Sequence, residues 1–171
     1  MIRLIESLQQ RPWSHRIDLE VVCGRNETLK RALRRLQACA GDSTTASRHG
    51  RMTLKISGFV NDLRDRLAQA DICLLRASPL VMTEVIASGV PSIAFDWHAH
   101  EAANAELLTR WECGRAVSSV RELMHVLQDW VTHPDQLAHM REATKRRAGN
   151  AFCLQTMKRI LDILKTGRGS V

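Results

Sequence analysis

The sequence lacks several features that define whole classes of protein. No apolar run approaches the roughly 20 residues that a helix needs to cross a bilayer. An acidic residue, Glu6, follows within the first few positions, so the N-terminus does not have the layout of a signal peptide. The five cysteines are odd in number and widely spaced, which favours neither a disulfide framework nor a CxxC metal site. We therefore expect a cytoplasmic protein in which Cys23 and Cys73 are buried as small apolar side chains.

Tyrosine is absent and aromatic residues make up only 4% of the chain, which bears on how its charge is interpreted. A formal net charge of +7 can attract nucleic acid or anionic lipid headgroups, or it can reflect solvated helix faces. With few aromatics and no recognition motif, we expect no nucleic-acid partner. Affinity for a membrane surface stays open, because charge alone does not establish it.

The 171 residues are 44% hydrophobic and 25% charged, a balance typical of one globular domain, which we assign to residues 1–171. Apolar periodicity alternates between the strand and helix types with short connections, and 41–51 is expected to be a surface loop. This alternation predicts an α/β fold, a Rossmann-like parallel sheet with helices on both faces and three C-terminal helices. The expected strands are 17–23, 52–56, 72–75, 91–95 and 114–117, and the expected helices are 2–10, 26–40, 60–70, 79–88, 100–111, 119–131, 134–148 and 151–166.

Polar residues follow the third expected strand, where open parallel sheets bind their ligands. Ser78 suits the N-cap position and Pro79 the first position of the next helix, whose free N–H groups can bind a phosphate. Arg76 can add positive charge, and Glu84, further along the helix, can accept hydrogen bonds from both hydroxyls of a ribose. Helix capping alone also explains Ser78 and Pro79. Glu84 can be a solvated residue, although its apolar neighbours favour partial burial and a partner.

A second polar segment, His98–Asn104, follows the fourth expected strand. Its HxHE spacing resembles metal-binding patterns, but no third ligand stands at a recognisable distance, so we expect no metal. At the start of a helix, His100, Glu101 and Asn104 can instead contact a polar ligand such as a sugar, or they can be capping and surface residues. The sequence has no P-loop, no GxGxxG and no Ser-His-Asp order, so it does not support a self-contained nucleophilic or hydride-transfer mechanism.

These segments together resemble the monogalactosyldiacylglycerol synthase and processive diacylglycerol glucosyltransferase family of GT-B glycosyltransferases. Val21–Leu29 resembles VVCGRNxxL, Ser57–Leu63 resembles GFVxDM, Arg76–Glu84 resembles KAGPxTxxE, and His100–Asn104 resembles QExxN, with a GxP-like Val90-Pro91 between the last two. The lipid-linked N-acetylglucosaminyltransferase of peptidoglycan synthesis has a similar outline. The resemblance covers residues 1–120 and implies the C-terminal, UDP-sugar-binding half of such an enzyme.

The resemblance also implies roles for particular residues. The backbone at Phe59 and Val60 would hold the uracil, and Ser78 and Pro79, with Arg76 nearby, would face the diphosphate. Glu84 would hold the ribose hydroxyls. The last group, His100, Glu101 and Asn104, would face the sugar or phosphate, with the UDP-sugar as substrate and no cofactor or metal. Catalytic residues are expected to be absent, because the family's base belongs to its N-terminal acceptor-binding domain.

The sequence departs from the family pattern at three places that bear on donor binding. Ser78 replaces a glycine, and its side chain can crowd the diphosphate. His100 replaces glutamine and adds sensitivity to pH. The family's opening strand and GGxxG loop are absent, so one neighbouring strand is expected to be an unpaired edge.

The implied function is hexosyl transfer from a UDP-hexose to a lipid acceptor such as diacylglycerol, with little activity expected from this chain alone. Two alternatives are a donor-binding subunit that needs a separate acceptor-domain partner and a non-functional truncated remnant. A UDP-N-acetylglucosamine 2-epimerase has the same fold but fits the GRN and GFV segments less well. The expected location is cytoplasmic, peripheral at the inner membrane surface.

Overall fold

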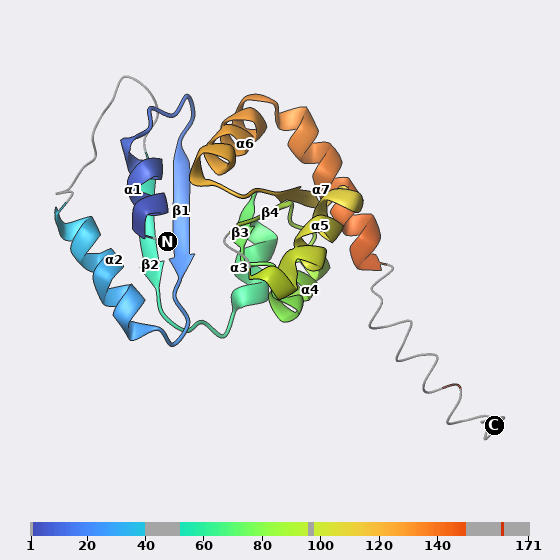
Figure 1. Ribbon diagram of the computed structural model, residues 1–171, viewed down its shortest axis with the longest axis horizontal. Coiled ribbons are helices and arrows are strands. Elements are labelled where there is room, and N and C mark those ends of the chain that lie inside the picture. The colour runs from blue at the N-terminus through green and yellow to red at the C-terminus, as the bar shows by residue number, and fades with distance from the viewer. Residues whose placement is uncertain (1, 40–51, 96–97, 150–161, 163–171) are drawn as a thin grey trace. The chain divides into compact units, whose positions relative to one another are not determined.

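The computed structural model describes residues 2–39, 52–95, 98–149 and 162, which belong to two compact units (Figure 1). The first unit comprises Met1–Leu63 and Ser118–Pro134, and the second comprises Arg64–Val117 and Asp135–Val171. The expected loop 41–51 lies outside the described residues, and so does nearly all of the expected helix 151–166. The assignment of a single domain to residues 1–171 stays a prediction.

The first unit is built on a pair of parallel strands, which align in register from Ile17 opposite Met52 to Val22 opposite Ser57. The first helix buries Leu4, Ile5 and Leu8, which recur at helical spacing and form one apolar face. The elements of this unit are α1 (Ile2–Gln10), β1 (Ile17–Val22), α2 (Glu27–Cys39), β2 (Met52–Ser57) and α6 (Val120–Thr132).

The second unit contains a three-stranded parallel sheet in the order β3-β4-β5. The central strand is buried at every position, as expected for a parallel strand covered on both faces. The elements of this unit are α3 (Leu63–Gln69), β3 (Cys73–Leu75), α4 (Pro79–Ala87), β4 (Ser92–Ala94), the 3-10 turn η1 (Ala99–Glu101), α5 (Ala102–Arg110), β5 (Gly114–Ala116) and α7 (Pro134–Gly149).

The α/β class and the parallel strands confirm the sequence prediction, but the described strands form two sheets in place of one. Apolar periodicity locates a strand, whereas pairing depends on partners distant in sequence, so periodicity alone does not fix sheet composition. Cys23 is buried as expected. Cys73 is half-buried, and burial raises the pKa of its thiol to about 12, so it is protonated at neutral pH. No described helix has both the length and the apolar character that crossing a bilayer requires.

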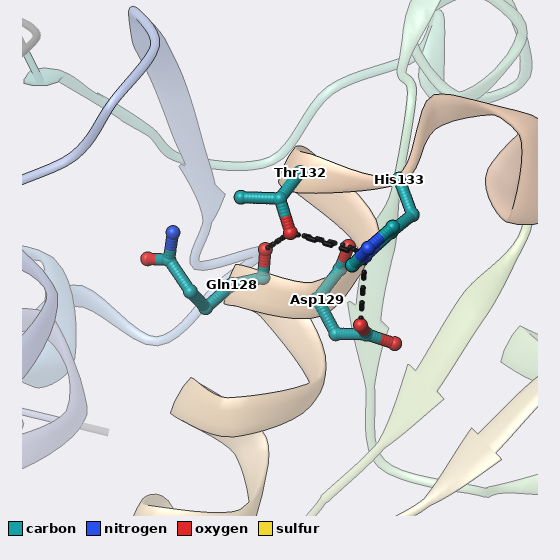
Figure 2. Close-up of polar contacts among 4 residues, drawn as sticks. All are labelled: Gln128, Asp129, Thr132 and His133. Carbon is teal, nitrogen blue, oxygen red and sulfur yellow. Dashed lines mark hydrogen bonds and ion pairs between the residues drawn. The ribbon is translucent and has the colours of Figure 1, made fainter.

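Side-chain contacts define both ends of α6. At its start, the Ser119 hydroxyl accepts a hydrogen bond from the Glu122 N–H at 3.1 Å. At its end, the Thr132 hydroxyl donates to the Gln128 carbonyl at 2.9 Å, and the His133 Nδ1 lies 2.9 Å from the Asp129 carboxylate (Figure 2). The Ser119 contact pairs an N–H that the helix start leaves without an intrahelical acceptor, and Pro134 begins α7 after the other end.

The packing of β5 against β4 predicts a strong effect of substitution at Gly114. A Cβ at this position would lie 1.9 Å from the Ser92 carbonyl oxygen, which belongs to the backbone of the neighbouring strand. We expect Gly114→Ala to lower the free energy of unfolding by about 3 kcal/mol or more, measured by urea denaturation. In the control Gly58→Ala, the added Cβ meets the flexible end of Lys30 at 3.0 Å and the Gly24 carbonyl oxygen at an ordinary contact distance of 3.7 Å. Equal destabilisation by the two substitutions would contradict this packing.

Candidate functional site

The start of α4 has backbone N–H donors that no group in the described part of the chain accepts from. Ser78 adopts an extended conformation (φ −69°, ψ 142°), and its side chain makes no capping hydrogen bond. Pro79 occupies the first turn, and the Met82 N–H donates to the Ser78 carbonyl at 3.0 Å. Among the described residues, the N–H groups of Leu80 and Val81 have no backbone or side-chain acceptor. The Ser78 hydroxyl and these two amides are therefore free to bind an anion, and plain side-chain capping does not account for Ser78.

Positively charged and polar side chains gather on the two loops that follow β3 and β4. Arg76 is half-exposed, with its Nη1 3.2 Å from the His98 Nε2. The His98 and His100 rings stack with centroids 5.5 Å apart. Because β3 and β4 are parallel neighbours, their loops emerge at the same edge of the sheet (Figure 1). We call the set Arg76, Ser78, His98, His100 and Glu101 the β3–β4 cluster.

Glu101 occupies the interior of the β3–β4 cluster. Its residue surface is only 2% exposed, and its Oε2 accepts a hydrogen bond from the His98 N–H at 2.9 Å and faces the Arg76 Nε at 3.4 Å. The hydrogen bond from His98 lowers the pKa of the Glu101 carboxyl, and the Arg76 charge adds to this effect against the opposing influence of burial. The carboxylate is therefore ionised at neutral pH and committed to protein partners.

Asn104, in the first turn of α5, also contacts the loop after β3. Its Nδ2 donates to the Ala77 carbonyl at 3.1 Å, and the residue is half-buried. The amide thus ties α5 to the loop that carries Arg76 and Ser78. The Asn104 amide therefore holds the backbone of that loop, whereas its expected contact with a ligand stays a prediction.

Glu84 is exposed on α4, and its carboxylate has no hydrogen-bond or ion-pair partner within the described part of the chain. The expectation of partial burial was wrong, because the apolar surface of α4 extends to solvent: Leu80 is 72% exposed. Leu80 and Glu84 are four residues apart and share one face of the helix. A free carboxylate beside an exposed apolar side chain can accept hydrogen bonds from a sugar that packs against Leu80.

Phe59 and Val60 belong to the first unit, in the loop after β2. Phe59 is 61% exposed, and the Arg25 guanidinium lies over its ring at 5.2 Å from the centroid, in the geometry of a cation–π contact. Gly24 has a φ of +56° and allows the turn that brings Arg25 after β1. These loops follow neighbouring parallel strands, so one edge of the β1–β2 sheet presents a planar pair of side chains to solvent.

The predicted residues thus divide between the two units. Arg76, Ser78, His100 and Glu101 lie together, whereas Phe59 and Val60 form part of the first unit. Three residues absent from the predicted set contact or adjoin predicted ones. They are His98 and Leu80 in the second unit, and Arg25 in the first. The HxH pattern pointed to His98, and the GRN motif contains Arg25, but no sequence signal marked Leu80 as exposed.

Two surface hollows lie elsewhere and include none of the predicted residues. One, of about 490 Å³, is lined by Arg11, Ser119, Arg121, Glu122 and His125 in the first unit. The other, of about 520 Å³, lies in the second unit near Gly114 and His139. In the first hollow, the Ser119 hydroxyl accepts from the Glu122 N–H at 3.1 Å and the Glu122 carboxylate accepts from the Ser118 N–H at 2.8 Å, so side chains cap the helix start there. The β3–β4 cluster is the stronger candidate because Ser78 makes no such cap and Arg76 adds a positive charge near the start of α4.

Sequence comparison finds glycosyltransferases that act on lipids according to their names. No protein-family model matches the chain. Monogalactosyldiacylglycerol synthase 3, chloroplastic, from Arabidopsis thaliana is 25% identical over 148 residues, 86% of this chain and 28% of that protein. The UDP-N-acetylglucosamine–N-acetylmuramyl-(pentapeptide) pyrophosphoryl-undecaprenol N-acetylglucosamine transferase of Pseudomonas aeruginosa is 29% identical over 114 residues, 61% of this chain and 32% of that protein. The chain therefore spans about a third or less of these curated relatives.

Solved structures give the same fold. The crystal structure of Acinetobacter baumannii MurG aligns with a TM-score of 0.66 and 20% identity, covering 96% of this chain and 45% of that one. WaaG, a glycosyltransferase involved in lipopolysaccharide biosynthesis, aligns with a TM-score of 0.56 and 16% identity, covering 95% of this chain and 50% of that one. At these identities the alignments establish the fold.

The pKa of Glu101 predicts how its ion pair contributes to stability as pH changes. A carboxylate with a lowered folded-state pKa stabilises the fold above its ordinary value of 4.5, and this contribution is lost as pH falls through the lowered pKa. We expect the melting temperature of Glu101→Gln to lie furthest below that of the wild type near neutral pH. The difference should shrink as pH falls below 4.5 and through the lowered pKa. The exposed pair Glu142–Lys145 gives the control Glu142→Gln, with a smaller difference. A difference for Glu101→Gln that does not change with pH would contradict the assignment.

Proposed function

We propose that this chain, a GT-B glycosyltransferase C-terminal-like domain related at low identity to monogalactosyldiacylglycerol synthase and MurG, binds the UDP-hexose donor of a hexosyltransferase. The proposed acceptor is a lipid such as diacylglycerol. Names of the relatives support this class of acceptor, because one contains diacylglycerol and another contains undecaprenol. The fold itself is compatible with many activities, so the proposal rests on the site.

The observation that carries the proposal is the uncapped start of α4 beside Arg76. Two free backbone N–H groups, the Ser78 hydroxyl and the positive end of the helix dipole favour a bound phosphate. Arg76 and His100 add donors from the neighbouring loops, and guanidinium groups suit phosphate oxygens in particular. A diphosphate offers enough oxygens to use these donors together.

The rest of the donor is assigned by residue chemistry. We propose that the unpartnered Glu84 carboxylate accepts hydrogen bonds from the two ribose hydroxyls, next to exposed Leu80. Phe59 and Val60, in the first unit, stay predictions for the uracil, and the Arg25 guanidinium lies over the Phe59 ring there. His100, Glu101 and Asn104 stay predictions for the sugar end, and the next subsection revises one of them.

In the proposed reaction, an acceptor hydroxyl attacks the anomeric carbon of the hexose. A bond forms between that oxygen and the carbon, the bond from the carbon to the UDP oxygen breaks, and UDP leaves with the additional negative charge. In this proposal the α4 amides and Arg76 stabilise this charge, because donors already fixed by the fold need no reorganisation when it develops. The proton of the acceptor passes to a base that we assign to an acceptor-binding part, in a longer chain or in a partner protein.

The lipid acceptor determines the location that we propose for the protein. An acceptor-binding part must hold a lipid, so we propose that the protein acts in the cytoplasm, peripherally at the inner membrane surface. The formal net charge of +7 favours approach to anionic headgroups. We expect residues 1–171 tested alone to bind donor and to transfer little or none of it, because the proposed site assigns them no catalytic base.

The donor site is tested by titrating the full chain with UDP in a calorimeter and in thermal melts. We expect binding in the wild type and at least about tenfold weaker binding by Glu84→Ala, because hydrogen bonds from the ribose to a charged carboxylate are lost. The matched control is Glu142→Ala, which removes an exposed carboxylate on α7 and should leave UDP affinity unchanged. Absence of UDP binding at millimolar concentration, or equal binding by wild type and Glu84→Ala, would rule out the assignment.

A further inference from the structure

Glu101 is the most deeply buried ionisable side chain in the β3–β4 cluster, and its contacts are unlike those of a ligand-binding residue. Its side chain is 3% exposed, whereas that of its partner Arg76 is 53% exposed. The same oxygen, Oε2, accepts from the His98 N–H and faces the Arg76 Nε. A carboxylate that reached into solvent to bind a sugar hydroxyl would have to release these partners.

Both partners of Glu101 lie on the loops that form the proposed diphosphate site. A buried carboxylate is stable only when it is paired and hydrogen-bonded. Glu101 therefore needs both the His98 N–H and Arg76, and its contacts hold these two groups in place. The reciprocal bond from the Glu101 N–H to the His98 carbonyl, at 2.8 Å, closes η1 into a tight turn. Glu101 therefore fixes the loop after β4 and, through Arg76, ties it to the loop after β3.

The Arg76 guanidinium is held at two of its nitrogens. Its Nε faces Glu101 and its Nη1 lies by His98, while half of the side chain is open to solvent. A planar guanidinium that is fixed at two nitrogens presents its remaining N–H donors in a set direction. Because less rotational freedom is lost on binding, a fixed guanidinium binds a phosphate more tightly than a free one does.

We infer that Glu101 is a positioning residue: it orients Arg76 and the His98–Glu101 turn for the diphosphate of the donor and does not itself contact the hexose. This inference rests on the proposed function and replaces the sequence-based expectation that Glu101 itself faces the sugar or phosphate. The low pKa of the Glu101 carboxyl agrees with it, because the ion pair then persists throughout the neutral range.

The two roles predict different ligand dependence, which uridine, UDP and a UDP-hexose can separate. Glu101→Gln keeps the size of the side chain and an oxygen for the His98 N–H, but it removes the charge that orients Arg76. We expect about tenfold weaker binding of both UDP and the UDP-hexose, by the same factor, with uridine unaffected. Weaker binding of the UDP-hexose alone, with UDP unchanged, would overturn the inference and return Glu101 to the sugar.

A double-mutant cycle tests whether Glu101 acts through Arg76. In an Arg76→Met background, Glu101→Gln should change UDP affinity by less than about twofold, because the group it orients is gone. Full additivity of the two substitutions would contradict the inference. Glu142→Gln, at an exposed ion pair on α7, should leave all three affinities unchanged and serves as the control.

A ligand-free measurement keeps the inference separate from the proposed function. In thermal melts at neutral pH, the losses caused by Arg76→Met and Glu101→Gln should be strongly non-additive if the pair exists. Additive losses would overturn the inference whether or not UDP binds. If the losses are non-additive but the wild type binds no UDP, the donor assignment fails. The ion pair then exists as a structural contact only, and the positioning role is rejected with the donor site.

Discussion

The parallel pairing of β3 with β4 is the constraint on which the candidate site depends. Cys73 aligns with Ser92 and Leu75 with Ala94, so both strands end at the same edge and their loops meet there. Next to this pair, β5 packs so closely that Gly114 has no room for a side chain against Ser92. A sheet in register on both sides of β4 positions the two loops so that the buried Glu101 carboxylate pairs with half-exposed Arg76.

Polar chemistry at this edge is divided into a supporting layer and an exposed layer. Glu101 and Asn104 turn inward and hold loop backbone and side chains, through His98, Arg76 and the Ala77 carbonyl. The start of α4, Arg76 and Glu84 face solvent with donors and acceptors that are unused within the described residues. Such a division is expected of a binding site, because exposed groups bind well only when buried neighbours fix their geometry.

Local sequence patterns predicted the elements far better than they predicted side-chain environments. Ser78-Pro79 marked the start of α4 correctly, and Asn26 accepts from the Leu29 N–H at 2.9 Å, as its predicted capping position requires. Such signals depend only on near neighbours. Helix α3 begins at Leu63, later than expected, because the loop from Gly58 extends further. The burial of Glu101 and the exposure of Leu80 depend on which elements pack over them, and so does the division into two sheets; none of these follows from periodicity.

The central claim is that the start of α4 binds the diphosphate of a UDP donor. Backbone amide NMR during a UDP titration of the isotope-labelled full chain tests this directly, because an amide proton that donates to phosphate shifts strongly. The account predicts the largest shifts at the N–H groups of Leu80 and Val81, with smaller shifts in the His98–Glu101 turn. Unchanged Leu80 and Val81 resonances at saturating UDP, with shifts gathered instead at the start of α6, would contradict it.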